Sequence, residues 1–476
     1  MLDYTLLHHG AVDGVTGSCH ELRTIDGQAL LVDCGLFQGA EVSAEGASAQ
    51  GLTIDFPIEK LQALVITHVH IDHVGRLPYL LAAGFRGPII CSEASAVLLP
   101  LVLEDALKVG VTPDARLIAR VLRQVSSQLV VLPYKRWHAL ASDWKIKLHP
   151  AGHILGSAYV EVRLSGRLAP SAPKGDWRIV FSGDLGAPHT ALLAAPKSPF
   201  RADLVVLEST YGDRLHQGRA SRRRQLKALV ERALGNRGSV LIPAFSIGRT
   251  QEILYDLESI IAAQASQGQS GNTDWMSLEI IVDSPLAARL TEAHSRLHYL
   301  WDAEARQHIA RGRQPLTFEQ RYIVETHAEH LQTVDYLARS ARPAVVIAAG
   351  GMCAGGRIVN YLKAMLGDPR HDVVFVGYQA AGTPGRDIQT YGPRGGYVEL
   401  DGKRYPIRAA VHSLGGYSAH ADQADLVRFL KRMRHPPAEV RLVHGDAAAK
   451  RALQVEIRKA LPQTTVSISV KEGASS

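Results

Sequence analysis

The stretch Thr67-His68-Val69-His70-Ile71-Asp72-His73 decides the fold, because it holds four side chains that can bind a metal ion. The apolar run 61–66 before it predicts a buried strand, and 74–83 after it has the pattern of a helix. The four side chains are therefore expected on a strand-to-helix turn. Imidazole and carboxylate together are typical of a zinc site that keeps a position open for substrate. A chance cluster of histidines, the alternative, would not be expected in this order on such a turn.

The composition is that of an ordinary folded chain of 476 residues, with 46% hydrophobic and 21% charged residues. This length predicts two or three domains. The formal net charge of +7 is compatible with a polyanionic partner. The four cysteines lie far apart without a Cys-x-x-Cys pair, which favours a reducing, cytoplasmic compartment. The sequence shows no signal peptide, and no apolar run approaches the roughly 18 residues of a membrane span.

Acidic and histidine side chains recur after successive predicted strands. Asp33 follows a buried strand, where an unpaired carboxylate is costly, so we expect it to orient a metal ligand; a turn-forming aspartate is the alternative. His153 stands between glycines in a turn that permits close approach of backbone to an ion. Asp184 and Glu208 each follow a further buried strand.

Residues 209–390 alternate helices and strands of their own, which predicts an inserted parallel α/β domain. Helices are expected at 219–235, 248–263, 286–301, 328–341 and 356–366, and strands at 239–243, 278–282, 344–348 and 373–377. Further helices are expected within 92–130, with Pro100 and Pro113 as breaks, and 264–273 is expected to be a loop.

Three turns of the insert, at 243–250, 347–357 and 377–386, place small residues and an arginine after a strand. Backbone N–H groups at helix starts and arginine side chains bind phosphate, whereas ordinary turn chemistry is the alternative for any one turn. The expected substrate contacts in these turns are Ser246, Arg249, Gly351, Arg357 and Arg386. The run Arg222-Arg223-Arg224 is either a solvated helix face or a nucleic-acid track.

The stretch 68–73 resembles the HxHxDH signature of the metallo-β-lactamase superfamily, and the three turns of the insert resemble a β-CASP domain. From residue 4 to about 460 the chain resembles β-CASP ribonucleases. The resemblance implies an α/β fold: a metallo-β-lactamase αββα sandwich with an inserted parallel-sheet domain. We expect the sandwich to be formed by 1–208 and 391–476, the latter with a C-terminal helix and strand, and the insert by 209–390.

The same resemblance implies a site with two divalent metal ions, most often zinc, with manganese tolerated. One ion is expected on His68, His70 and His153, the other on Asp72, His73 and His444, with Asp184 as the bridge. Asp72, Glu208 and His420 are the expected catalytic residues, with Glu208, His420 and His444 at the family's motifs A, B and C. Ser209 and Ser418, next to motif residues, are further expected substrate contacts. Gly350, Asn360 and Ala381 depart from the family's usual residues on the substrate side.

The expected activity is metal-dependent hydrolysis of RNA in RNA processing or decay, by a water activated between two ions, leaving 5′-phosphate and 3′-hydroxyl ends. His444 is a histidine, as in the RNA-processing branch, where the DNA-processing branch has valine. The extra domains of the family's 5′-exonucleases and archaeal members are not seen in the sequence, so an endonuclease, with a homodimer as an option, is expected. The alternatives are a DNA nuclease, a small-molecule hydrolase and a non-catalytic scaffold.

Overall fold

The computed structural model describes residues 3–38, 41, 48, 51–216, 221–266, 275–340, 342–379 and 382–469. The chain divides into two compact units: Met1–Pro188, Ala194–Leu215 and His420–Ser476 form the first, and His189–Leu193 and His216–Ala419 form the second. The domain limits expected from the sequence stay a prediction. Most of the loop expected at 264–273, and Ala381, lie outside the described residues.

The first unit holds two mixed sheets. The six-stranded sheet has the order β1 (Tyr4–Gly10), β2 (Cys19–Thr24), β3 (Ala29–Val32), β4 (Leu61–Val65), β5 (Ile89–Ser92) and β6 (Leu129–Leu132). The seven-stranded sheet has the order β21 (Thr465–Ile468), β20 (Glu439–Leu442), β11 (Leu204–Leu207), β10 (Asp176–Phe181), β9 (Ala158–Ser165), β8 (Trp144–Pro150) and β7 (Trp137–Ala141). Strands β3 to β6 are parallel, as are β10, β11, β20 and β21.

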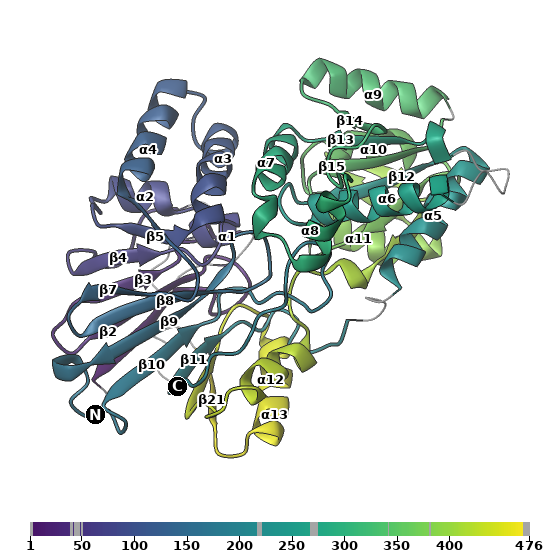
Figure 1. Cartoon of the computed structure of the whole chain (residues 1–476). Coiled ribbons are helices and arrows are strands. Elements are labelled where there is room, and N and C mark those ends of the chain that lie inside the picture. The colour runs from purple at the N-terminus through teal and green to yellow at the C-terminus, as the bar shows by residue number, and fades with distance from the viewer. Residues whose placement is uncertain are drawn as a thin grey trace. The chain divides into compact units, whose positions relative to one another are not determined.

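The two sheets enclose one apolar core, because successive side chains of a strand point to opposite faces. Ile179 and Phe181 of β10 join Val32 and Val65 of the other sheet in this core. Val180, between them, faces a second core. That second core is completed by α12 (Gln423–Lys431) and α13 (Ala447–Ala460), drawn in yellow beside β21 in Figure 1.

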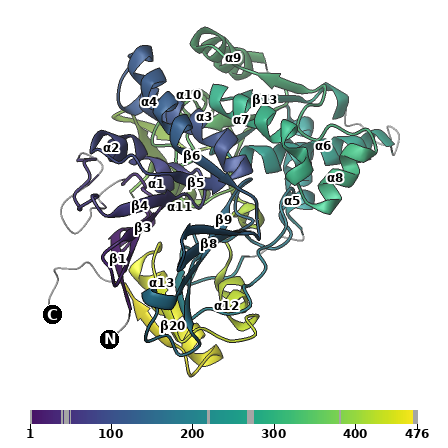
Figure 2. The same ribbon diagram turned by 60° about the vertical axis from the view of Figure 1, so that its left-hand side comes forward.

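Four helices cover the other sheet: α1 (Ile71–Val74), α2 (Leu77–Ala82), α3 (Glu93–Gly110) and α4 (Ala115–Gln128). In Figure 2, α1 and α2 lie beside β4 and β5, on the side away from β20. The unit is therefore the predicted αββα sandwich. No helix of the described ranges is long and apolar enough to cross a membrane.

The second unit is built on a six-stranded sheet whose neighbours are all parallel, as predicted. Its order is β14 (Arg321–Ile323), β13 (Glu279–Asp283), β15 (Ala344–Ala349), β12 (Ser239–Ala244), β16 (Asp372–Phe375) and β19 (Ala410–Ser413). The connecting helices include α5 (Arg222–Asn236), α6 (Arg249–Ser266), α7 (Pro285–Arg296), α8 (Ala303–Ala310), α9 (His327–Ser340), α10 (Ile358–Met365) and α11 (Pro384–Tyr391). A hairpin of β17 (Tyr397–Leu400) and β18 (Lys403–Pro406) completes it.

Several elements differ from the sequence prediction. The break expected at Pro100 is wrong: α3 continues through it, because Leu99 and Leu103 on either side are buried and their packing offsets the lost hydrogen bond. The single helix expected at 74–83 is two short ones, and Pro78 stands in the first turn of the second, where proline is tolerated. The sequence prediction missed α8, α11 and β14, each of eight residues or fewer.

Candidate metal centre

All seven predicted metal ligands lie at one edge of the sandwich, five in loops after strands and two in a short helix. His68 and His70 follow β4, with Asp72 and His73 in α1, while the other three follow β8, β10 and β20. Gly183, with a φ of +50°, lets the Asp184 loop approach, because a Cβ there would lie 2.7 Å from the Cβ of Thr67. The sharp turn at His444 takes a φ of +49°, which is uncommon for a residue other than glycine.

The first triad is His68, His70 and His153. Nε2 of His68 and Nε2 of His153 each lie 3.1 Å from Nδ1 of His70. The two Nε2 atoms also lie 3.5 Å from Oδ2 of Asp184. These four residues offer ligand atoms within 4.8 Å of one another.

The second triad is Asp72, His73 and His444. Nε2 of His73 lies 3.3 Å from Nε2 of His444, which lies 3.4 Å from Oδ2 of Asp72. Oδ1 of Asp184 lies 3.4 Å from the His73 nitrogen and 3.7 Å from the His444 nitrogen. One carboxylate therefore turns one oxygen to each triad.

These residues fit divalent metal ions. Two imidazole nitrogens bound tetrahedrally at about 2.05 Å from an ion lie roughly 3.3 Å apart, close to the distances within both triads. Oδ1 of Asp184 is buried and has no hydrogen-bond partner in the described part of the chain, which is costly for a carboxylate unless an ion satisfies it. Burial lowers the pKa of His70 to about 4, whereas at His444 the carboxylates of Asp184 and Asp72 outweigh burial and raise the pKa to about 9.

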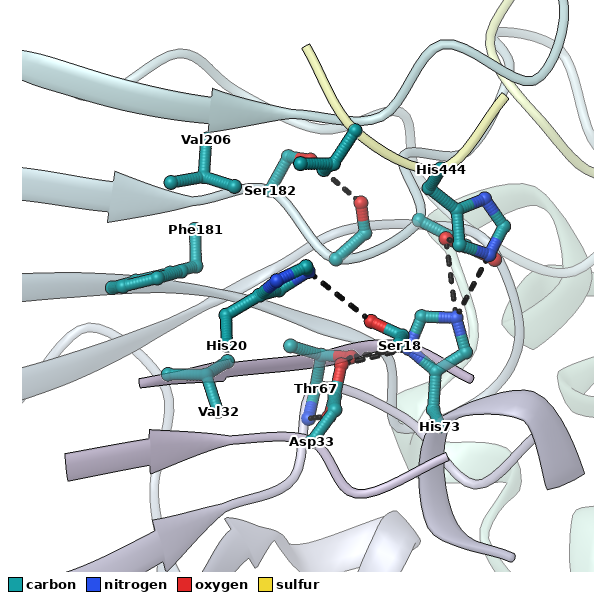
Figure 3. Close-up of a pocket in the computed structure, with 13 residues that line it drawn as sticks. Ser18, His20, Val32, Asp33, Thr67, His73, Phe181, Ser182, Val206 and His444 are labelled. Carbon is teal, nitrogen blue, oxygen red and sulfur yellow. Dashed lines mark hydrogen bonds and ion pairs between the residues drawn. The ribbon is translucent and has the colours of Figure 1, made fainter. Parts of the chain in front are cut away.

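Side chains behind the ligands hold the rings in place. Oδ2 of Asp33 lies 2.7 Å from Nδ1 of His73, and the same carboxylate accepts hydrogen bonds from the backbone N–H and hydroxyl of Thr67. Figure 3 shows Asp33 beside Thr67 and His73, with His444 facing His73 from the other side. Oγ1 of Thr210 lies 3.1 Å from Nδ1 of His444. The sequence prediction missed Thr67 and Thr210, whose one signal is a hydroxyl near a motif residue.

Glu208 and His420 meet beside the first triad. Oε2 of Glu208 lies 3.1 Å from Nδ1 of His420, and its Oε1 accepts the N–H of Leu185 at 2.6 Å. The His420 ring centre lies 4.5 Å from that of His153. Burial opposes protonation of His420, but the carboxylates of Glu208 and Asp184 outweigh it and raise its pKa.

Ser209 has its hydroxyl committed within the sandwich. Its Oγ donates to the backbone oxygen of Val443, and its N–H donates to the backbone oxygen of His444. A Cβ at Gly445 would lie 2.4 Å from this Oγ, so the motif C turn packs closely on Ser209.

Two of the predicted substrate contacts in the second unit are arginines with internal partners. The guanidinium of Arg249 is buried and donates to Glu252, with 2.6 Å between Nη1 and Oε2. The guanidinium of Arg357 donates to the buried Asp283, with 2.6 Å between Nη1 and Oδ1.

The other four predicted substrate contacts in the second unit differ in how far they are exposed to solvent. Ser246 and Arg386 are half-buried, and Nε of Arg386 donates to the backbone oxygen of Gln379. Gly351 is buried, and a Cβ added to it would lie 3.1 Å from the ring of Phe245. Ser418 is also buried.

Comparison with known proteins shows which families the parts of the chain resemble. Three family models match the chain: the metallo-beta-lactamase superfamily at residues 12–163, the Beta-Casp domain at 250–388 and the Zn-dependent metallo-hydrolase RNA specificity domain at 404–468.

Curated relatives match most of the chain. Ribonuclease TTHA0252 of Thermus thermophilus is 37% identical over 437 residues, which cover 92% of each chain. Transcription termination factor FttA of Methanocaldococcus jannaschii is 28% identical and that of Cenarchaeum symbiosum 30% identical. These alignments cover 92% and 94% of this chain, but 66% and 67% of the two factors.

Proposed function

The chain belongs to the β-CASP family of the metallo-β-lactamase superfamily and is a metal-dependent ribonuclease; from this premise we propose an endonuclease with two zinc ions. The observation that carries the proposal is the position of Asp184. Its Oδ2 lies 3.5 Å from two nitrogens of the first triad, and its Oδ1 lies 3.4 Å from His73 of the second. A carboxylate divided in this way suits a bridge between two ions.

We assign the ions to the two triads, with Asp184 between them. When bound, two divalent ions lower the pKa of water to supply a nucleophile at neutral pH and clamp the phosphate oxygens during in-line displacement. Asp33 orients His73, and Thr210 orients His444, so the ligand atoms are held before substrate arrives. Asp72 is a ligand of the second ion and the partner of the His444 ring.

We propose that His420 is the general acid. Glu208 holds Nδ1–H of the imidazole, which fixes the ring and favours its protonated form. The ring can then give its Nε2 proton to the departing 3′ oxygen, leaving 3′-hydroxyl and 5′-phosphate ends. The two triads are assigned without His420 and Glu208, so the proposal gives His420 the proton transfer and Glu208 the orientation of its ring.

We propose single-stranded RNA rather than DNA as substrate, since motif C carries His444. In the second unit, Ser246, Gly351, Arg386 and Ser418 remain proposed RNA contacts. Arg249 and Arg357 keep their guanidinium groups on internal carboxylates, so we propose that they shape the loops that bind RNA. Ser209 is proposed to support the His444 turn.

The four cysteines are free and buried, which supports a cytoplasmic location as part of this proposal. A homodimer is also part of the proposal, and light scattering of the purified chain tests it.

The deciding experiment incubates the zinc-loaded protein with 5′-labelled and internally labelled RNA, with and without chelator. Internal fragments that carry 5′-phosphates and disappear with chelator are expected. Release of mononucleotides from the 5′ end alone would show exonuclease action. DNA of the same length and at the same salt concentration is the matched substrate, since phosphate contacts make both affinities salt-dependent. Equal or faster DNA cleavage would contradict the substrate assignment.

A further inference from the structure

One segment of the sandwich carries an excess of positive charge. Residues 106–142 contain six lysines and arginines and one acid, Asp114, so they carry a formal charge of +5 (6 minus 1). The whole chain carries +7. The segment comprises the end of α3 and all of α4, β6 and β7.

Three arginines form a stripe along α4. Arg116, Arg120 and Arg123 stand at positions i, i+4 and i+7, which lie on one helix face and span about 10 Å. All three are exposed, whereas Ile118 and Val125 on the opposite side are buried. We call these three arginines the α4 stripe.

The α4 stripe has no acidic partner. None of its arginines forms an ion pair with any residue of the described ranges, and α4 itself contains no acid. Three other exposed cations on helices have acidic partners. Arg296 pairs with Glu292, Arg339 with Asp335 and Lys459 with Glu456.

Two arginines of the α5 run, whose sequence predicts either a solvated helix face or a nucleic-acid track, are bound to an acid of the same unit. Arg222 is buried, and its Nε donates to Oδ2 of Asp256 at 3.0 Å. Arg223 donates to Oδ1 of the same carboxylate at 3.1 Å. One carboxylate therefore holds two of the three arginines of the α5 run, whereas no arginine of the α4 stripe has such a partner in the described part of the chain.

The helix pair α3–α4 is joined to the candidate metal centre. Ser92 and Ser95, at the start of α3, donate from their hydroxyls to the backbone oxygen of Gly156, at 2.6 and 3.0 Å. Gly156 belongs to the same turn as His153. The C-terminal end of α4 leads into β6, which pairs with β5, the strand before α3. Hydrogen bonds and strand pairing thus connect the stripe to the turn that carries the candidate ligand His153.

We propose that the α4 stripe binds the backbone phosphates of RNA outside the cleavage site. The stripe proposal rests on the proposed function, since RNA must be bound by the protein surface before it can be cleaved at the metal centre. Arginine pairs with phosphate through two hydrogen bonds, and an exposed row of three without competing carboxylates suits consecutive phosphates of any base sequence. The stripe would strengthen binding of RNA long enough to reach α4 and leave very short substrates unaffected.

The test measures binding of a phosphorothioate RNA of about 20 nucleotides to the zinc-loaded protein on ice, by fluorescence anisotropy at several salt concentrations. For single strands the logarithm of the affinity falls with the logarithm of salt by about 0.7 per neutralised phosphate. Replacing Arg116, Arg120 and Arg123 by Gln together should therefore make the slope shallower by about 2. The affinity should fall about 100-fold at 0.1 M salt and converge with the wild type near 1 M.

Two control variants distinguish the loss of phosphate contacts at the stripe from a change in the net charge of the protein. Arg296→Gln, Arg339→Gln and Lys459→Gln together remove the same three charges from ion-paired sites and should change the slope little. Replacing the three stripe arginines by Lys should keep the slope. An equal loss in the paired-site variant would overturn the proposal, because net charge alone would then explain the effect.

The other outcomes are equally decisive. Wild-type protein that neither binds nor cuts RNA would overturn both the stripe and the proposed function. Normal wild-type binding with an unchanged slope in the stripe variant would overturn the stripe alone. Loss of binding to phosphatidylserine vesicles without loss of RNA affinity would overturn it in favour of a lipid surface.

Discussion

Nδ1 of His420 lies 3.1 Å from Oε2 of Glu208, although 212 positions separate the two residues. His420→Ala should keep both metal equivalents yet slow RNA cleavage by on the order of 10²–10⁴, the usual range for a positioned proton donor. Metal content by elemental analysis and single-turnover cleavage measure the two effects. An ester with a nitrophenolate leaving group, which needs no proton, should hide most of the defect.

Glu208→Gln should slow cleavage less than His420→Ala, and the double variant should be far from additive because the two residues act together. Loss of metal from His420→Ala, or equal impairment on the nitrophenolate ester, would make His420 a ligand or structural residue.

Asp33→Asn should weaken metal binding at the second triad and spare the first. The amide cannot hold Nδ1 of His73 and the hydroxyl of Thr67 as the carboxylate does at 2.7 and 2.8 Å. Changes behind a ligand typically cost 10–100-fold in metal affinity, so about one of the two proposed zinc equivalents should be lost on dialysis against a weak chelator. Asp143→Asn, at a β-turn away from the ligands, is the control and should retain both. Equal retention by Asp33→Asn would contradict this role.

Lys450→Met should also disturb His444, through the backbone. The buried ammonium of Lys450 donates to the backbone oxygen of Val12, and burial lowers its pKa to about 8. In the same loop, the backbone oxygen of Ala11 accepts a hydrogen bond from the N–H of His444, at 2.8 Å. Leaving a buried carbonyl unpaired costs about 1–3 kcal/mol, so urea unfolding should show a loss of this size together with weaker zinc binding. Lys459→Met, on the exposed side of the same helix, should change neither.

Glu161 should make the fold sensitive to acid. Burial raises its pKa, but hydrogen bonds from His149 and Lys147 outweigh this and hold it at about 2, below the ordinary 4.5. A depressed carboxyl pKa gives stability that is present above about 4.5 and is lost as the pH falls toward about 2. Glu161→Gln should therefore cost up to about 3 kcal/mol at pH 7 and about half as much near pH 3, measured by urea unfolding. Glu292→Gln, at an exposed pair, should show no such pH dependence.

The sequence was sufficient to indicate which candidate ligands come together, because most of their positions are set locally. His68, His70 and His73 share one turn, and Asp184 follows the end of a buried strand, so the pattern itself indicates which side chains converge. The layers of the sandwich followed from the same strand pattern and from the family resemblance.

The sequence was not sufficient where a side chain depends on a distant partner. Arg357 is a predicted RNA contact, and the sequence did not indicate that its guanidinium is held by Asp283, 74 positions earlier. Arg222 likewise meets Asp256, 34 positions later. Short elements such as α8 were missed for a similar reason, since eight residues carry too little periodicity to mark a helix before packing does.

Strand β11 cannot complete its pairing until β20, which lies much later in the chain, has been translated. Val205 pairs with Val440, so 235 residues (440 minus 205) must be translated after the first strand before its partner exists. At 5–20 residues per second this takes roughly 10–50 s, during which the apolar edge of β11 stays open on the nascent chain. If the ribosome stalls within this interval, the unpaired apolar edge of β11 is exposed to aggregation, chaperones and proteases. The order of the segments therefore makes correct folding of a new chain dependent on uninterrupted translation.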